Sequence, residues 1–168
     1  LLVGTEGQLS LLRSGLTGEA SSWTVQSQLQ LDSAPTAAVL VDIDADSRTE
    51  AVIACSDGTL RIIGVVGQEL VEDPDPIDLS GAVIDVLEWA ELNGDGIPDL
   101  LAGGADGLRI IRQVTTFDLD TFEFITTFSI TGLMPFAAPV ESISITDLDR
   151  DGRLDAVVSA GDGIFLRG

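Results

Sequence analysis

A nine-residue acidic pattern that occurs three times constrains the fold of this chain more than any other feature. Its clearest copy is Asp147 to Asp155 (DLDRDGRLD), with carboxylates at positions 1, 3, 5 and 9 and a glycine after the third. Earlier copies are DIDADSRTE at residues 42–50 and ELNGDGIPD at residues 91–99. Oxygens at these positions, with a backbone carbonyl at position 7, can surround one hard cation, and Ca²⁺ takes about 6–8 such ligands. The pattern predicts up to three calcium sites on a repeating scaffold.

The repeat extends beyond the acidic loop. Each loop is followed by an apolar segment, a turn made of an acidic residue and a glycine, and a second apolar segment. The acidic residues of these turns are Glu6, Asp57, Asp106 and Asp162, so the turns are 51, 49 and 56 residues apart. A period near 50 residues fits one blade of a β-propeller and is too long for a leucine-rich or ankyrin repeat.

Short runs of Val, Ile, Leu and Thr, separated by Gly, Asp and Pro, predict an all-β chain without a helix. The predicted units are a partial blade at 1–32, whole four-stranded antiparallel blades at 33–81 and 82–135, and a partial blade at 136–168. We expect the fourth strand of the second unit at 76–79, and a connection between the last two units at 131–139. The partial blades duplicate each other's middle strands, so we expect an arc that cannot close a ring by itself.

The second strand of each unit has an unusual composition. Residues 50–55, 99–103 and 155–160 are almost continuously apolar, which is typical of strands covered on both faces. They end in small residues, which suits close packing between neighbouring blades. Cys55 stands at such an end, so we expect a buried structural thiol, and a single cysteine forms no internal disulfide.

The charge of the chain excludes some partners. There are 28 acidic residues against eight basic ones, all arginine, and the net charge is −20. Such a surface repels nucleic acid and attracts cations or basic partners. Eleven of the 28 acidic residues lie in the three loops, which favours metal sites over general adaptation to salt, although the latter stays open. No apolar run is long enough for membrane insertion, and no signal peptide is visible.

The loop, the strand after it and the acid–glycine turn resemble the FG-GAP or VCBS-type repeat of calcium-binding β-propellers, a family that includes the head of integrin α subunits and several fungal lectins. The resemblance covers nearly the whole chain. It implies side-chain ligands at positions 1, 3, 5 and 9 and a carbonyl ligand at position 7. The implied ligands are Asp42, Asp44, Asp46, Arg48 and Glu50; Glu91, Asn93, Asp95, Ile97 and Asp99; and Asp147, Asp149, Asp151, Arg153 and Asp155. The chain departs from the family at Ser47, where glycine is usual, and at Glu91, which is one methylene longer than the family's first ligand.

The acidic pattern of the loops has two other interpretations. An EF-hand begins with the same acidic pattern, but it needs a glutamate at position 12 and flanking helices. Position 12 is occupied here by Ile53, Ala102 and Val158, and strands are expected on both sides. A solvated acidic turn without metal is the other alternative. Four carboxylates within nine residues would repel one another without a cation, which favours the metal site.

The composition also limits catalysis. Without His, Lys or Tyr, acid–base chemistry would depend on carboxylates, and the spare ones are Asp85, Glu88 and Glu141 on first strands. We expect these to form a solvated channel wall, so the chain is predicted not to be an enzyme. The favoured function is a non-catalytic calcium-binding propeller module of a secreted or cell-surface protein that binds a protein or glycan. The alternatives are an accessory propeller of a larger extracellular carbohydrate-active enzyme and a purely architectural module. Further expected partners are the remainder of a larger propeller or another copy of the chain.

Overall fold

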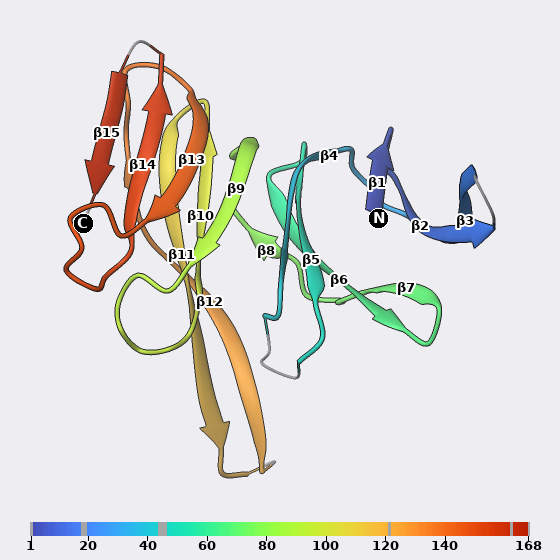
Figure 1. The fold of residues 1–168 in the computed structure, drawn as a ribbon. Coiled ribbons are helices and arrows are strands. Elements are labelled where there is room, and N and C mark those ends of the chain that lie inside the picture. The colour runs from blue at the N-terminus through green and yellow to red at the C-terminus, as the bar shows by residue number, and fades with distance from the viewer. Residues whose placement is uncertain (1, 18–19, 44–46, 121, 162, 168) are drawn as a thin grey trace.

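A computed structural model describes residues 2–17, 20–43, 47–120, 122–161 and 163–167, and these residues form strands and connecting segments without a helix (Figure 1). The strands lie in four antiparallel sheets that follow one another along the chain. The first sheet contains β1 (Leu2–Thr5), β2 (Gln8–Thr17) and β3 (Ala20–Gln30); the second contains β4 (Pro35–Val41), β5 (Glu50–Cys55), β6 (Thr59–Val66), β7 (Glu69–Glu72) and β8 (Ile77–Asp78). The third contains β9 (Ile84–Ala90), β10 (Asp99–Gly104), β11 (Gly107–Asp118) and β12 (Glu123–Met134); the fourth contains β13 (Val140–Thr146), β14 (Asp155–Ala160) and β15 (Gly163–Arg167). The all-β class and the antiparallel sheets are confirmed.

Two predicted elements were wrong in extent. The second sheet has two short strands where one was expected at 76–79: β7 pairs with the far end of β6, and β8 pairs with its beginning. A tight turn at Gly67, which has a positive φ of 66°, turns the chain back to form β7. The connection expected at 131–139 is shorter, because β12 continues to Met134 by pairing with β11 past a register shift.

The second strand of each later sheet is the most buried part of the molecule. All six residues of β10 are buried, and β5 is buried from Ala51 to Cys55. In β14 four of the six residues are buried. This confirms the interpretation of the runs in β5 and β10 as strands covered on both faces, whereas in β14 Val157 and Ser159 are only half-buried. Cys55 is buried, and burial raises the pKa of its thiol, so it is a packing residue.

Apolar clusters join each sheet to the next. The cluster between the second and third sheets includes Val41, Val52 and Leu87, and equivalent clusters join the first sheet to the second and the third to the fourth. The first strands lie beside one another, β4 next to β9 and β9 next to β13. Gly103 shows how close the sheets approach, because an added Cβ there would lie 2.5 Å from Val140 Cγ1 in the fourth sheet.

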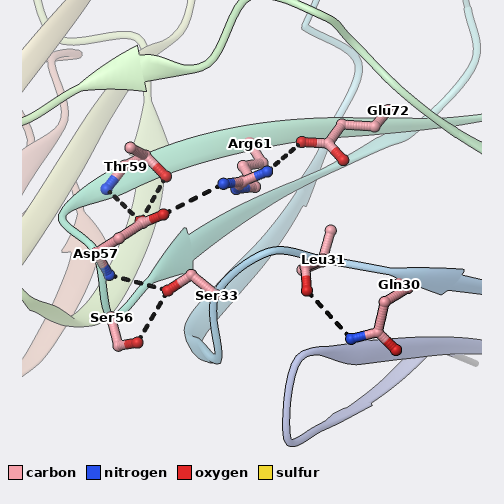
Figure 2. A network of polar contacts seen from close by, with 8 residues as sticks. All are labelled: Gln30, Leu31, Ser33, Ser56, Asp57, Thr59, Arg61 and Glu72. Carbon is pink, nitrogen blue, oxygen red and sulfur yellow. Dashed lines mark hydrogen bonds and ion pairs between the residues drawn. The ribbon is translucent and has the colours of Figure 1, made fainter.

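The acid–glycine turn of the second sheet is fixed by a polar network (Figure 2). Asp57 accepts hydrogen bonds from the Thr59 hydroxyl at 2.7 Å and from Arg61 at 3.2 Å, and Arg61 also donates to Glu72 at 2.7 Å. The backbone N–H of Asp57 donates to Ser33 in the connection from the first sheet, at 3.0 Å. Desolvation acts to raise the pKa of Asp57, but the hydrogen bonds from Thr59 and Arg61 outweigh it and lower that pKa. The acid of this turn therefore has a structural role.

Candidate metal centre

The third loop, between β13 and β14, brings three of its predicted ligands together. Each of the carboxylates of Asp147, Asp149 and Asp151 offers an oxygen within 4.8 Å of the others. The backbone folds around them: Asp147 accepts from the N–H of Asp151 and of Gly152, both at 3.1 Å, and Asp149 accepts from the N–H of Asp151 at 3.0 Å. In the described part of the chain this is the acidic group gathered closely enough to hold a metal ion.

The loops share an unusual backbone conformation at their sixth position. Gly96 and Gly152 have positive φ values of 80° and 89°, and Ser47 has the same left-handed conformation at 70°. The fourth position is also left-handed in two loops, at Gly94 with φ 80° and at Arg150 with φ 64°. Residues with a side chain adopt this conformation at a cost, and Ser47 adopts it nonetheless.

The last acidic residue closes each loop in the same way. The carboxylate of Glu50 accepts from the N–H of Ile43 at 3.1 Å, and that of Asp155 accepts from the N–H of Leu148 at 2.7 Å. Asp99 accepts from the backbone of Leu92, which is the equivalent residue of the middle loop. The glutamate at position 50 therefore performs the same closure as the aspartates.

Two buried carboxylate oxygens in the described residues have no hydrogen-bond partner, and both belong to predicted ligands. They are Oδ1 of Asp42, the first residue of the first loop, and Oδ2 of Asp99, the last residue of the middle loop. Burial raises the pKa of Asp99, which is 1% exposed; Arg112 acts to lower this pKa, and nearby acidic residues raise it further. An unpaired buried carboxylate is costly unless a cation or donor compensates it. The donor set, made of oxygens alone, fits a hard cation such as Ca²⁺.

The middle loop is arranged differently from the third. Glu91 accepts hydrogen bonds from the N–H groups of Asn93 and Gly94, so the side chain is turned toward the loop backbone. The Asn93 amide donates to Asp95 at 2.9 Å, and Asp95 accepts from the N–H of Ile97 at 2.8 Å. Glu91, Asp95 and Asp99 thus do not form a close acidic group of the kind found in the third loop, within the residues described.

The remaining predicted ligands are Asp44, Asp46 and the three residues at the seventh positions. Asp44 and Asp46 lie outside the described residues. Arg48, Ile97 and Arg153 occupy the seventh positions, directly after the left-handed residues, and their roles as carbonyl ligands stay a prediction.

Sequence reasoning missed a residue that supports the first loop. The side chain of Gln113, on β11 of the third sheet, is buried, and its amide donates to the backbone carbonyl of Ile43, the second residue of that loop. The strand β11 also contains Arg109, Arg112 and Thr115, so polarity alone does not single out Gln113 in the sequence. Gln113 thus connects the first loop to the neighbouring sheet.

Comparison with known proteins found one family match, which covers the middle and third loops. Residues 91–158 match the family model of the FG-GAP-like repeat, and this range contains the middle loop and the third loop. The predicted resemblance to an FG-GAP-type repeat is thereby confirmed for that part of the chain. No curated protein matches the chain. Within the residues described, no helix has the length and apolar character needed to span a membrane.

Proposed function

We propose that this chain is a non-catalytic, calcium-binding β-propeller module in which Ca²⁺ has a structural role. The observation that carries the proposal is the group of three carboxylates at Asp147, Asp149 and Asp151. The unpartnered buried oxygens of Asp42 and Asp99 extend the argument to the other two loops, giving up to three calcium ions. Calcium that binds the native loops stabilises the fold by mass action.

The propeller arrangement is supported by the way in which the sheets follow one another. Each sheet packs on the next through an apolar cluster, and the first strands β4, β9 and β13 lie in a row. Sheets placed radially around a common axis, with their first strands innermost, would have these contacts. In this arrangement the three acidic loops all join the first strand of a sheet to the second.

The proposed setting is a secreted or cell-surface protein that binds a protein or glycan. The third loop is largely exposed, the middle loop is exposed at residues 93–96, and neither has a helical frame, so we expect affinities in the range of extracellular modules, about 10⁻⁴–10⁻³ M. Calcium outside cells is abundant enough to fill such sites. Nanomolar affinity would remove this argument for the compartment.

The proposal is non-catalytic because the spare carboxylates offer no catalytic arrangement. Asp85 and Glu141 are exposed on β9 and β13, and Glu88 is half-buried. Within the described residues these three do not gather into one acidic group. A solvated wall of the propeller channel is the role that we propose for them.

Calorimetric titration of the chelator-stripped chain with Ca²⁺ tests this function, with equilibrium dialysis to count bound ions. We expect binding of up to three ions, and loss of one site in the variant Asp149→Asn. The matched control is Asp32→Asn, which makes the same charge change at an exposed residue outside the loops and should leave the count unchanged. An absence of saturable calcium binding by the wild-type chain would refute the proposal.

A further inference from the structure

An uncharged pocket opens between the first and second sheets. Its volume is about 350 Å³, and its walls come from β2, β4 and β5 and from the end of β1. The residues that matter for the argument are Gly4, Leu9, Pro35, Ala38, Leu40 and Ile53. The pocket therefore exposes apolar surface on β4, which is one of the row of first strands.

The other first strands show what normally covers such surface. Ala38 pairs with Ile53, Leu87 with Ala102 and Ile143 with Val158, and each partner is the twelfth residue counted from the start of its loop, so Ala38, Leu87 and Ile143 are equivalent. Leu87 and Ile143 are both 5% exposed. The strand alongside covers each of them, β4 for Leu87 and β9 for Ile143.

The equivalent surface of β4 lacks this cover in the described part of the chain. Ala38 is exposed. Leu40 on β4 and Trp89 on β9 are also equivalent, and they differ in exposure in the same direction but less strongly, at 60% and 40%. The face of β4 that turns toward the first sheet is thus the uncovered counterpart of the faces of β9 and β13.

The edge of β1 beside this pocket is also free for strand pairing. In the later sheets the strand before the acid–glycine turn is paired on both sides: β5 lies between β4 and β6, and β10 lies between β9 and β11. The strand β1 occupies the same place before its turn, but within the described residues it pairs with β2 alone. Its other edge can accept an antiparallel strand, as β5 and β10 do.

We propose that the edge of β1 and the pocket on β4 together bind one β-strand, the first strand of a further repeat unit of this kind. The chain itself indicates the side chains that such a strand carries. Val39 and Val41 of β4 pack in the cluster that contains Leu87, and Val86 and Ala90 of β9 pack in the cluster that contains Ile143. The occupant therefore has small aliphatic residues at alternate positions and adds a strand antiparallel to β1.

This inference rests on the side-by-side sheets of the proposed function and does not require bound calcium. The probe is a fluorescently labelled peptide with the sequence of residues 34–43, which contains the strand that covers β9. Its binding to the full chain is followed by anisotropy, first in calcium and then in chelator, with circular dichroism to confirm that the chain is folded. Saturable binding is expected wherever the chain is folded.

Two matched comparisons make the test specific. Leu40→Glu places a charge in the pocket and should weaken peptide binding about tenfold or more, the effect of losing one buried aliphatic side chain. Val66→Glu is the control, because Val66 on β6 is 62% exposed and lies outside the pocket. A peptide with N-methyl groups at alternate backbone positions keeps the side chains but removes strand pairing, and it should also bind weakly.

Three results would overturn the inference. The first is an absence of saturable peptide binding, and the second is an equal effect of the two glutamate variants. The third is self-association that Leu40→Glu abolishes and the peptide does not displace, which would make a second copy of the chain the occupant. Calcium titration separates this proposal from the proposed function. Normal calcium binding without peptide binding refutes the strand site alone, whereas peptide binding without calcium binding refutes the calcium-dependent function alone.

Discussion

Asp149→Asn should change stability in opposite directions with and without calcium. The ligand oxygens of Asp147, Asp149 and Asp151 lie within 4.8 Å of one another, and two unit charges at such a distance repel by about 1 kcal/mol under water-like screening. The substitution removes two of the three repulsive pairs. It keeps the oxygen that accepts from the N–H of Asp151 at 3.0 Å. After further screening by salt, we expect the variant to be more stable in chelator by about 1 kcal/mol.

Calcium should reverse the sign. An ion that binds the native state alone stabilises it by about 2.7 kcal/mol at a concentration of 100 times its dissociation constant. A variant that loses this site loses the stabilisation by bound calcium, but it keeps the gain from weaker repulsion between the carboxylates. At saturating calcium we therefore expect Asp149→Asn to be less stable than the wild type by about 1–2 kcal/mol.

Urea unfolding followed by tryptophan fluorescence measures both values on the same proteins. The wild type, Asp149→Asn and the control Asp32→Asn are compared in excess chelator and in calcium at about 100 times the dissociation constant found by titration. The control should shift by the same small amount in both solutions, because Asp32 is exposed and lies outside the loops. If Asp149→Asn lowers stability equally in both solutions, the three carboxylates do not form a calcium site.

Four further outcomes are expected. The thermal midpoint of the wild type should be clearly higher in millimolar calcium than in chelator, and identical midpoints would contradict metal-coupled folding. Gly103→Ala should cost about 1–3 kcal/mol of unfolding free energy, since the added Cβ meets Val140 at 2.5 Å, and Val140→Ala in the same chain should restore part of it. Ser47→Gly should raise the free energy of unfolding, measured in urea, by about 0.5–1 kcal/mol. The substitution removes the cost of the left-handed conformation at Ser47, and the greater entropy that glycine loses on folding offsets part of this gain. Arg109 donates to Asp106 at 2.7 Å and 2.6 Å and thereby lowers the pKa of Asp106. The pair therefore stabilises the fold above about pH 4, and this contribution disappears as the pH falls further. Asp106→Asn should lower the free energy of unfolding by a few tenths of a kcal/mol at neutral pH and leave it unchanged in acid.

Local patterns predicted most of the strands because their causes are local. The apolar runs of β5 and β10 are visible in the sequence because both faces of these strands are covered, so no polar alternation interrupts them. The limits of β7, β8 and β12 were missed. They depend on which part of β6 or β11 each segment pairs with, and that pairing is not encoded by the composition of the segment alone.

The candidate site was predictable to a similar extent. Spacing alone identified the three carboxylates that gather in the third loop. It did not predict the orientation of Glu91, whose longer side chain reaches the backbone N–H groups of Asn93 and Gly94. Nor could it predict Gln113, because the carbonyl to which its amide donates lies 70 residues earlier in the chain.

Because the Gln113 amide donates to the carbonyl of Ile43, the first loop is supported by the third sheet as well as by its own. The loop runs from Asp42, directly after β4, to Glu50, the first residue of β5, yet a donor that holds its backbone comes from β11. A piece of the chain cut before β11 would retain every predicted ligand of that loop and lose this support. The smallest piece of the chain that keeps the first loop with this support is therefore the loop together with the second and third sheets, which sets a lower limit on what can be grafted, truncated or exchanged.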